Sequence, residues 1–203
     1  MLELWLVRHG VTDWNHAGRI QGWADPPLNA VGRAQAERLA PRLADVAFDR
    51  VVSSDLERAR STAALALPGA HVELDPRLRE LDYGAFDGAT WADLATGELA
   101  EAAAHWRGDR QGRRTPGGES FDDLAARVRA FRAGLPPSGR TIAFSHSGTI
   151  RTALYGVLGR PDGHGWGLEI ANTSITVLRV EERRTTLVTL NDHGHLGSLV
   201  QAV

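Results

Sequence analysis

The sequence of 203 residues contains no cysteine and no lysine, so all 23 of its basic side chains are arginines. Without cysteine, disulfide bonds, cysteine nucleophiles and thiolate zinc sites are excluded. Without lysine, the phosphate-binding lysine of P-loop proteins, Schiff-base chemistry and a lysine general base are excluded as well. The side chains left for chemistry are histidine, carboxylate, hydroxyl and arginine groups.

Long apolar runs are also missing. No stretch of about 18 apolar residues occurs, so no membrane-spanning helix is predicted. The amino-terminal residues have a strand pattern and no basic segment, which does not fit a signal peptide, and we expect a cytoplasmic protein. The formal net charge is −2, so neither a nucleic-acid partner nor a membrane partner is expected. With 42% apolar residues, the chain is predicted to form one domain over residues 1–203.

The tripeptide Arg8-His9-Gly10 directly follows an apolar segment, residues 2–7, that has the pattern of a β-strand. Ligands of α/β proteins bind where strands end, because polar groups converge there. Gly10 lets the backbone turn sharply and approach a ligand closely. Arg8 offers forked donors that suit phosphate oxygens, and His9 can act as a nucleophile, a base or a metal ligand.

Strand and helix patterns alternate through the first half of the chain. Asn29 is expected to cap a helix that Pro41 kinks or ends, and Ser54 or Asp55 is expected to cap the next helix. The predicted elements are a helix from Asn29 through Leu39, a strand at 48–53, a helix ending before Pro68 and a strand at 71–74. A strand, a helix and a strand at this spacing form a βαβ unit, which predicts a parallel sheet.

The second half begins with an aperiodic stretch, residues 75–92, that we interpret as a loop leaving a strand. Residues 91–107 are predicted to be helical, and the basic, glycine-rich residues 108–118 form either a surface loop or a lid over an anionic substrate. The expected later elements are a helix starting at Ser120 with a capping box, a buried strand at 141–145, a helix at about 149–158 and a hairpin of strands at 174–180 and 185–190.

Phosphoryl transfer through histidine needs a neutral imidazole, positive groups for the phosphoryl oxygens and an acid for the leaving oxygen. The sequence offers a candidate for each where a predicted strand ends. Arg58 lies in the first turn of a helix, and helix N-termini favour anions. His146 and Ser147 stand at another helix start, and Glu80 lies in the aperiodic stretch. Two arginines and a second histidine around one phosphate would stabilise the transition state.

Six blocks in order resemble the histidine phosphatase superfamily, also called the phosphoglycerate-mutase-like family, and they span nearly the whole chain. The first block, Leu-Val-Arg-His-Gly-x-Thr-x-Trp-Asn, is the most specific. The blocks are residues 6–15, Gln21-Gly22 with 27–29 and 32–36, residues 53–59, residues 78–88, Pro116-Gly117-Gly118-Glu119-Ser120 and Ser145-His146-Ser147-Gly148.

The resemblance implies a three-layer α/β/α sandwich, with a mainly parallel sheet and an antiparallel edge strand. It implies that His9 is the residue phosphorylated and that Glu80 is the proton donor. The remaining implied site residues are Arg8, Arg58 and His146 in the phosphate pocket, and Asn15, Thr12, Gln21, Gly22 and Ser147 as phosphate or substrate contacts. The family needs no metal and no other cofactor, so the expected partner is a small phosphorylated substrate.

Three functions remain open at this point. A phosphomonoesterase is favoured, because the chain is short after the Glu80 block and has Gln21 in a stretch similar to the phosphatase branch. A phosphoglycerate mutase would use the same phosphohistidine, and a non-catalytic phospholigand-binding module would keep only the fold. His193 and His195 have a metal-like spacing, but no third ligand follows from it. Residues 89–118 are expected to select the substrate, and the oligomeric state is left open.

Overall fold

The computed structural model describes residues 1–159 and 167–199 of the chain. Its centre is a six-stranded sheet with the order β3-β2-β4-β1-β5-β6. The first four of these strands run parallel, β5 runs antiparallel to β1, and β6 runs antiparallel to β5. The mainly parallel sheet with antiparallel pairing at one edge is therefore confirmed. The strands are β1 (Leu2–Arg8), β2 (Arg50–Ser53), β3 (Glu73–Leu74), β4 (Gly139–Ser145), β5 (Ile175–Val180) and β6 (Thr185–Asp192).

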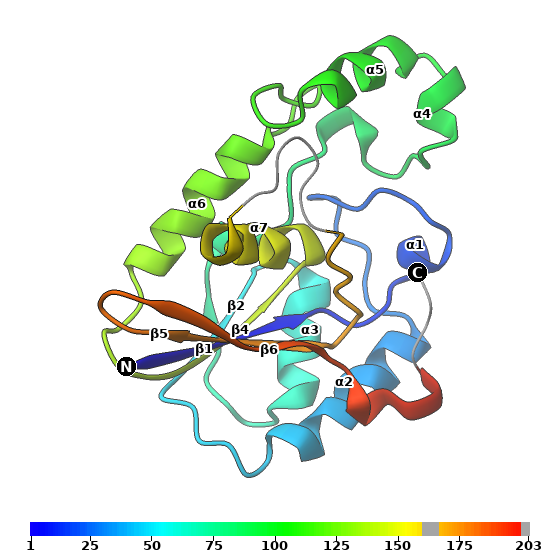
Figure 1. Ribbon diagram of the computed structural model, residues 1–203. Coiled ribbons are helices and arrows are strands. Elements are labelled where there is room, and N and C mark those ends of the chain that lie inside the picture. Colours follow the sequence, from blue (N-terminus) through cyan, green and yellow to red (C-terminus); the bar gives the residue numbers. More distant parts are fainter. Residues whose placement is uncertain (160–166, 200–203) are drawn as a thin grey trace.

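Helices cover both faces of this sheet, with α6 and α7 on one side and α2 and α3 on the other (Figure 1). This arrangement is the three-layer α/β/α sandwich that the sequence predicts. The α-helices are α1 (Asp13–His16), α2 (Ala30–Leu43), α3 (Glu57–Ala66), α4 (Asp93–Thr96), α5 (Ala100–Gly108), α6 (Phe121–Ala133) and α7 (Ser147–Leu158). Three short 3-10 helices are η1 (Pro76–Leu78), η2 (Gly84–Phe86) and η3 (Gly194–Leu199).

Strand β1 shows how the apolar pattern fills the two halves of the core. Leu4 and Leu6 belong to the buried cluster that includes side chains of α6 and α7. Val7 belongs to the other buried cluster, which includes Leu39 of α2 and Ala63 of α3. Because successive side chains of a strand point to opposite faces, one strand serves both layers. The polar residues at its end, Arg8 and His9, therefore start from a rigid support.

Of the two outcomes predicted for Pro41, a kink or a helix end, the end is excluded, because α2 continues through Pro41 to Leu43. A proline in the last turn removes only one hydrogen bond near the helix end. The predicted cap of the next helix is wrong. Helix α3 is capped by neither Ser54 nor Asp55, because it starts at Glu57. Instead, the carboxylate of Asp25 accepts from the backbone N–H of Glu57, at 2.9 and 2.8 Å. A residue from a distant loop thus supplies the cap.

The segment that carries α4 and α5 lies beyond α7 in the view of Figure 1, on the side away from the sheet. The helix predicted over residues 91–107 is broken, because the backbone turns extended at Gly97 (φ −84°, ψ −173°), which ends α4, and α5 begins only at Ala100. Trp106 of α5 is buried, and its ring lies 5.9 Å from that of Trp91 and 6.0 Å from that of Tyr83. These aromatic contacts anchor α5 to the segment that follows Glu80.

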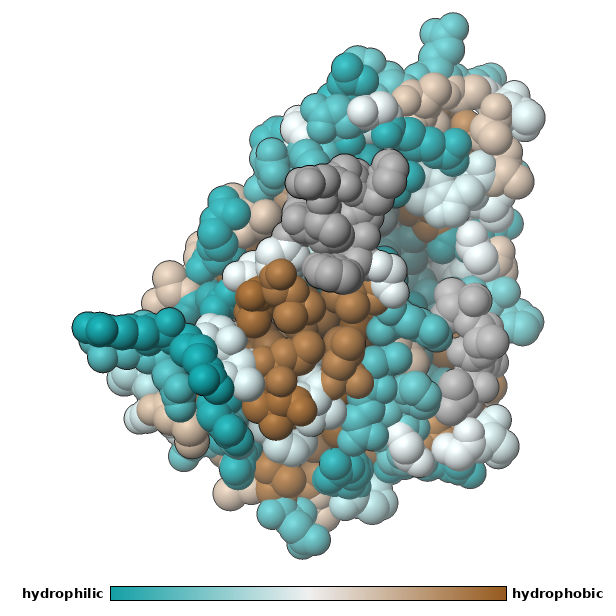
Figure 2. Space-filling view, viewed as in Figure 1, coloured by the Kyte–Doolittle hydropathy of each residue, from teal (hydrophilic) through white to brown (hydrophobic). Residues whose placement is uncertain are grey.

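Apolar side chains gather on the surface over α7 and toward the sheet, whereas the surface recedes between the α4–α5 segment and the segment that carries α1 (Figure 2). Leu158 of α7 and Val188 and Leu190 of β6 are exposed apolar residues. None of the helices within the described residues is long and apolar enough to cross a lipid bilayer.

Candidate active site

The carboxyl ends of β1, β4 and β2 lie side by side at the same end of the sheet. The segments that follow these strands, which carry His9, His146 and Ser54, therefore come together there. Arg8 is the register partner of Ser145, and the His9 N–H donates to the Ser145 carbonyl at 3.0 Å. On the other side of β4, the Ser54 N–H donates to the carbonyl of Phe144 at 2.9 Å. Polar groups that follow adjacent parallel strands converge in this way on a common crevice.

His9 is buried, and its hydrogen bonds set the tautomer of its ring. The Nδ1 atom lies 2.7 Å from the carbonyl oxygen of Gly10, which can only accept, so Nδ1 carries the proton. The Nε2 atom then keeps a lone pair, so it can act as a nucleophile or a base. Burial, followed by the charges of Arg58 and Arg8, lowers the pKa of His9 well below its usual value, which keeps the imidazole neutral.

Arg8 and Arg58 are buried guanidinium groups held by backbone carbonyls. Arg8 Nη1 donates to the carbonyl of Ile170 at 2.6 Å. Arg58 Nη2 donates to the carbonyl of Gly22 at 2.7 Å, and its Nη1 donates to that of Ala24 at 2.8 Å. Burial lowers the pKa of each arginine to about 10, so both stay positively charged at neutral pH. These charges suit the equatorial oxygens of a phosphoryl group.

His146 completes the group of cationic and imidazole side chains. Its ring centroid lies 5.1 Å from that of His9, and its Nε2 atom lies 2.9 Å from Ser54 Oγ. Burial, followed by the Arg58 charge, lowers the pKa of His146. Ser54, which the sequence predicts together with Asp55 as a candidate helix cap, is instead the partner of this ring.

Several buried polar atoms of these residues have no hydrogen-bond partner within residues 1–159 and 167–199. They are Nε of Arg8, Nε of Arg58, Nδ1 of His146 and Nε2 of Gln21. A buried polar group without a partner costs about 1–3 kcal/mol, and such groups cluster where a protein has a catalytic or binding role. An anion with several oxygens, such as a phosphoryl group, has the chemistry to satisfy these donors.

Glu80 lies across from the arginines, and two backbone amides hold its carboxylate. The Leu81 N–H donates to Oε1 and the Gly148 N–H donates to Oε2, both at 2.9 Å. Each oxygen accepts only one of these bonds, so a position remains for a proton or a substrate oxygen. Burial lowers the pKa of Arg8 and Arg58, and the Glu80 carboxylate opposes part of this lowering in both, which places the three groups near one another.

Thr12, Gln21 and Asn15 lie together beside this group. Thr12 Oγ1 donates to Gln21 Oε1 at 2.5 Å, and the Thr12 N–H donates to Asn15 Oδ1 at 3.2 Å. Thr12 and Asn15 form the capping box of α1, so the Asn15 side chain is used within its own loop. A substrate contact for these three residues stays a prediction.

Gly22 and Ser147 have defined places as well. The Gly22 carbonyl holds Arg58, and its N–H donates to Asp87 Oδ1 at 2.5 Å. Ser147 is the first residue of α7, and its hydroxyl lies 3.5 Å from Arg151 Nη2. The role predicted for them in substrate binding is likewise untested.

Residues far from His9 in the sequence hold the backbone around it, and no local sequence pattern predicts them. Asn172 Nδ2 donates to the carbonyl of His9 at 2.9 Å, and the Thr173 N–H donates to that of Arg8 at 3.0 Å. From α3, Thr62 Oγ1 accepts from the Gly10 N–H at 3.0 Å. These contacts join segments that are far apart in the sequence, so periodicity and spacing carry no trace of them.

The two carboxy-terminal histidines use their rings in other contacts. His193 Nδ1 donates to the carbonyl of Asn191 at 2.7 Å, and His195 Nε2 lies 3.2 Å from Thr173 Oγ1. Within the described part of the chain, no three histidine, aspartate or glutamate side chains are grouped as metal ligands.

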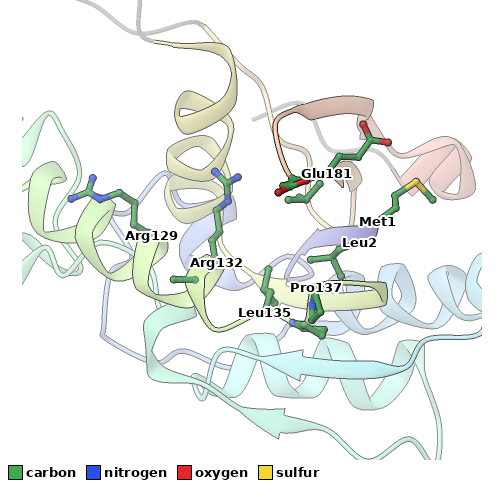
Figure 3. Close-up of a pocket in the computed structure, with 11 residues that line it drawn as sticks. Met1, Leu2, Arg129, Arg132, Leu135, Pro137 and Glu181 are labelled. Atoms are coloured by element: carbon green, nitrogen blue, oxygen red, sulfur yellow. The ribbon is translucent and has the colours of Figure 1, made fainter.

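A surface pocket of about 580 Å³ lies at the opposite end of β1 (Figure 3). It is lined by Met1, Leu2, Arg129, Arg132, Leu135, Pro137 and Glu181 among others, and the described residues that line it include no histidine. Leu2 begins β1 and His9 follows its end, so the strand separates this pocket from the candidate active site.

Comparisons with known proteins show which family the sequence resembles. The sequence model described as "Histidine phosphatase superfamily (branch 1)" matches residues 4–193. A Proteus mirabilis protein named probable phosphoglycerate mutase GpmB is 39% identical over 181 residues, which cover 87% of this chain and 84% of that protein.

Two solved structures are also similar to this chain. The alpha-ribazole phosphatase from Shigella flexneri has a TM-score of 0.85 and 32% identity, covering 94% of this chain and 96% of that one. A mycobacterial glucosyl-3-phosphoglycerate phosphatase in complex with VO3 has a TM-score of 0.78 and 34% identity, covering 93% and 98% of the two chains.

Proposed function

Because the chain belongs to branch 1 of the histidine phosphatase superfamily, we propose that it hydrolyses phosphate monoesters of small metabolites through a phosphohistidine at His9. The observation that carries this proposal is the hydrogen bond from His9 Nδ1 to the Gly10 carbonyl. It leaves the Nε2 lone pair of a neutral, buried imidazole beside two buried guanidinium groups. A nucleophile activated in this way needs no metal ion to neutralise the phosphoryl oxygens, since Arg8 and Arg58 supply the positive charge.

In the first step, the His9 Nε2 lone pair forms a bond to phosphorus while the bond between phosphorus and the ester oxygen breaks. Glu80, protonated at this stage, gives its proton to the leaving oxygen, so the product departs as an alcohol. The buried arginines and His146 stabilise the charge that spreads over the phosphoryl oxygens.

In the second step, water attacks the phosphorus of the phosphohistidine. The Glu80 carboxylate accepts a proton from this water as the new oxygen–phosphorus bond forms and the nitrogen–phosphorus bond breaks. Inorganic phosphate leaves, the His9 lone pair is restored, and Glu80 is again protonated for the next substrate. One ester and one water molecule are thus converted to one alcohol and one inorganic phosphate, and the enzyme returns to its starting state.

A phosphoglycerate mutase is the second candidate, and the name of the Proteus mirabilis relative favours it. A mutase would return the phosphoryl group to a second hydroxyl of its substrate rather than to water. Release of phosphate from p-nitrophenyl phosphate, measured beside conversion of 3-phosphoglycerate to 2-phosphoglycerate, separates the two. Hydrolysis without conversion supports the phosphatase, and conversion without net hydrolysis supports the mutase.

The substrate itself is to be found with a panel of phosphate monoesters, including sugar phosphates, phosphoglycerate derivatives and a nucleotide-loop phosphate such as alpha-ribazole phosphate. We propose that residues 89–118 select among them, because this segment contains α5, whose Trp106 ring packs against Tyr83, three residues after Glu80. Turnover should be unchanged by EDTA and inhibited by vanadate, which mimics the phosphoryl transition state. A cytoplasmic location, the single-domain organisation and the lack of nucleic-acid and membrane partners stay predictions.

A further inference from the structure

Arg127, on α6, donates hydrogen bonds to three carbonyls in the segment that carries Glu80. Its Nη1 atom donates to the carbonyl oxygens of Arg77 and Arg79, at 2.9 and 2.8 Å. Its Nη2 atom donates to the carbonyl oxygen of Glu80 itself, at 2.7 Å. The Arg127 side chain is only 15% exposed, so these bonds form largely out of contact with water. One rigid guanidinium therefore fixes the backbone at and just before the proposed acid.

Glu119, in the loop before α6, holds Arg127 and the other side of the same segment. Its carboxylate accepts from Nε and Nη2 of Arg127, both at 2.8 Å, in a two-pronged ion pair. Its Oε2 atom also accepts from the Asp82 N–H at 3.0 Å, and the Glu119 N–H donates to the Asp82 carbonyl at 2.8 Å. We name this pair the Arg127–Glu119 clamp.

The segment depends on such contacts because it has no regular structure of its own. Residues 79–83, between η1 and η2, belong to no helix and no strand. Buried carbonyls there must find partners outside the local backbone. The Glu80 carbonyl accepts from Trp23 Nε1 as well as from Arg127, and the Arg79 carbonyl accepts from Thr149 Oγ1. The position of the acid is thus set by side chains, with Arg127 contributing the most bonds.

We propose that Arg127 and Glu119 are positioning residues for the reaction, which hold the Glu80 carboxyl at the leaving oxygen of the ester. This inference rests on the proposed function, since it assigns no chemistry to the clamp apart from that of Glu80. A displacement of about 1 Å at a catalytic group can slow turnover by about 10²-fold. The slowing should be greatest for substrates whose leaving oxygen needs the proton most.

The test uses Arg127→Met, which keeps the length of the side chain and removes its donors, with Arg129→Met as the control. Arg129 lies two residues away on α6 and is exposed. We measure kcat and KM for p-nitrophenyl phosphate, phenyl phosphate and an alkyl phosphate. In Arg127→Met, kcat/KM should fall by about 10²-fold for the alkyl ester and by less than about threefold for p-nitrophenyl phosphate, because kcat/KM reports the transfer to His9 and not the later attack of water, which is the same for every ester. Arg129→Met should match the wild type for all three esters.

A double variant separates positioning from a general loss of structure. If Arg127 acts through Glu80, then adding Arg127→Met to Glu80→Gln should lower kcat by less than a further factor of about three. If Arg127→Met proves insoluble, Arg127→Lys and Glu119→Gln decide, because each retains part of the clamp. Both should show the same dependence on the leaving group with a smaller loss.

An equal loss of kcat/KM for all three esters, losses that multiply in the double variant, or folded variants with wild-type turnover would overturn the clamp. The outcome for Glu80→Gln alone distinguishes the two proposals. If it lowers kcat/KM equally for all esters, Glu80 is not the acid and the proposed function has failed in that role. If it behaves as expected while the Arg127 and Glu119 variants do not, only the clamp has failed.

Discussion

The backbone N–H of Gly148, in the first turn of α7, donates a 2.9 Å hydrogen bond to Oε2 of Glu80. A methyl group on Gly148 would lie 2.2 Å from Oε1 of the same carboxylate, closer than two such atoms can approach. Residue 148 therefore has to be glycine for the acid to lie where it does. The partial positive charge of a helix N-terminus also favours a carboxylate at this place.

Replacing Gly148 with alanine should displace the Glu80 carboxylate and reduce turnover. We expect kcat to fall by about 10²-fold for alkyl phosphates, because proton transfer to the leaving oxygen loses its geometry. Steady-state kinetics on the purified variant measures this. The control is Gly156→Ala, further along α7 at an exposed position, where the added methyl would meet only the end of the Arg132 side chain. Wild-type kcat in Gly148→Ala would contradict the placement of Glu80.

Stability should decrease as the pH falls below about 6.5, the ordinary pKa of histidine in an unfolded chain. Burial, followed by the charge of Arg58, lowers the pKa of both His9 and His146 in the folded protein. Below that pH the unfolded chain binds protons that the folded protein does not. Each histidine should therefore lower the free energy of unfolding by about 1.4 kcal/mol per pH unit.

Urea unfolding followed at several pH values measures this slope. His146→Gln should reduce this slope by about one bound proton, that is, by about 1.4 kcal/mol per pH unit. A slope that is the same in His146→Gln as in the wild type would show that His146 is not held neutral by the fold.

Asp25 should contribute to stability through its bonds to the first N–H of α3. Asp25→Ala removes the carboxylate that caps this helix among the residues the structure describes and that lies 3.5 Å from Arg58 Nη1. We expect a loss of about 1 kcal/mol in the free energy of unfolding, which thermal or urea unfolding detects. Asp45→Ala, at an exposed position after α2, is the matched control. Equal stability of the two variants would show that the cap contributes nothing.

The sequence predicts those parts of the fold and site that local patterns encode. The apolar run ending in Arg8-His9, the Ser120 capping box and the hairpin near the carboxy terminus all have such patterns, and the structure has each of them. Side-chain contacts between distant segments leave no local pattern. The cap from Asp25, the bond from Asn172 to the His9 carbonyl and the contacts of Arg127 therefore emerge only from the folded chain.

The wrongly predicted cap of α3 has the same origin. Ser54 and Asp55 have the residue types of helix caps, but tertiary partners engage them. Ser54 Oγ lies against His146, and Asp55 pairs with Arg79, with Oδ1 2.7 Å from Nε. Local propensity is overridden where a polar side chain has a stronger partner elsewhere in the fold.

The most direct test of the account is whether phosphate becomes attached to His9. The enzyme is mixed with a radiolabelled phosphate monoester, quenched during turnover in alkali, which preserves phosphohistidine, and digested for peptide mapping. Label is expected on the peptide that contains His9, with rates of formation and breakdown at least as fast as kcat, and no label is expected in His9→Ala. Turnover with label on another residue, or undiminished hydrolysis by a folded His9→Ala variant, would contradict it.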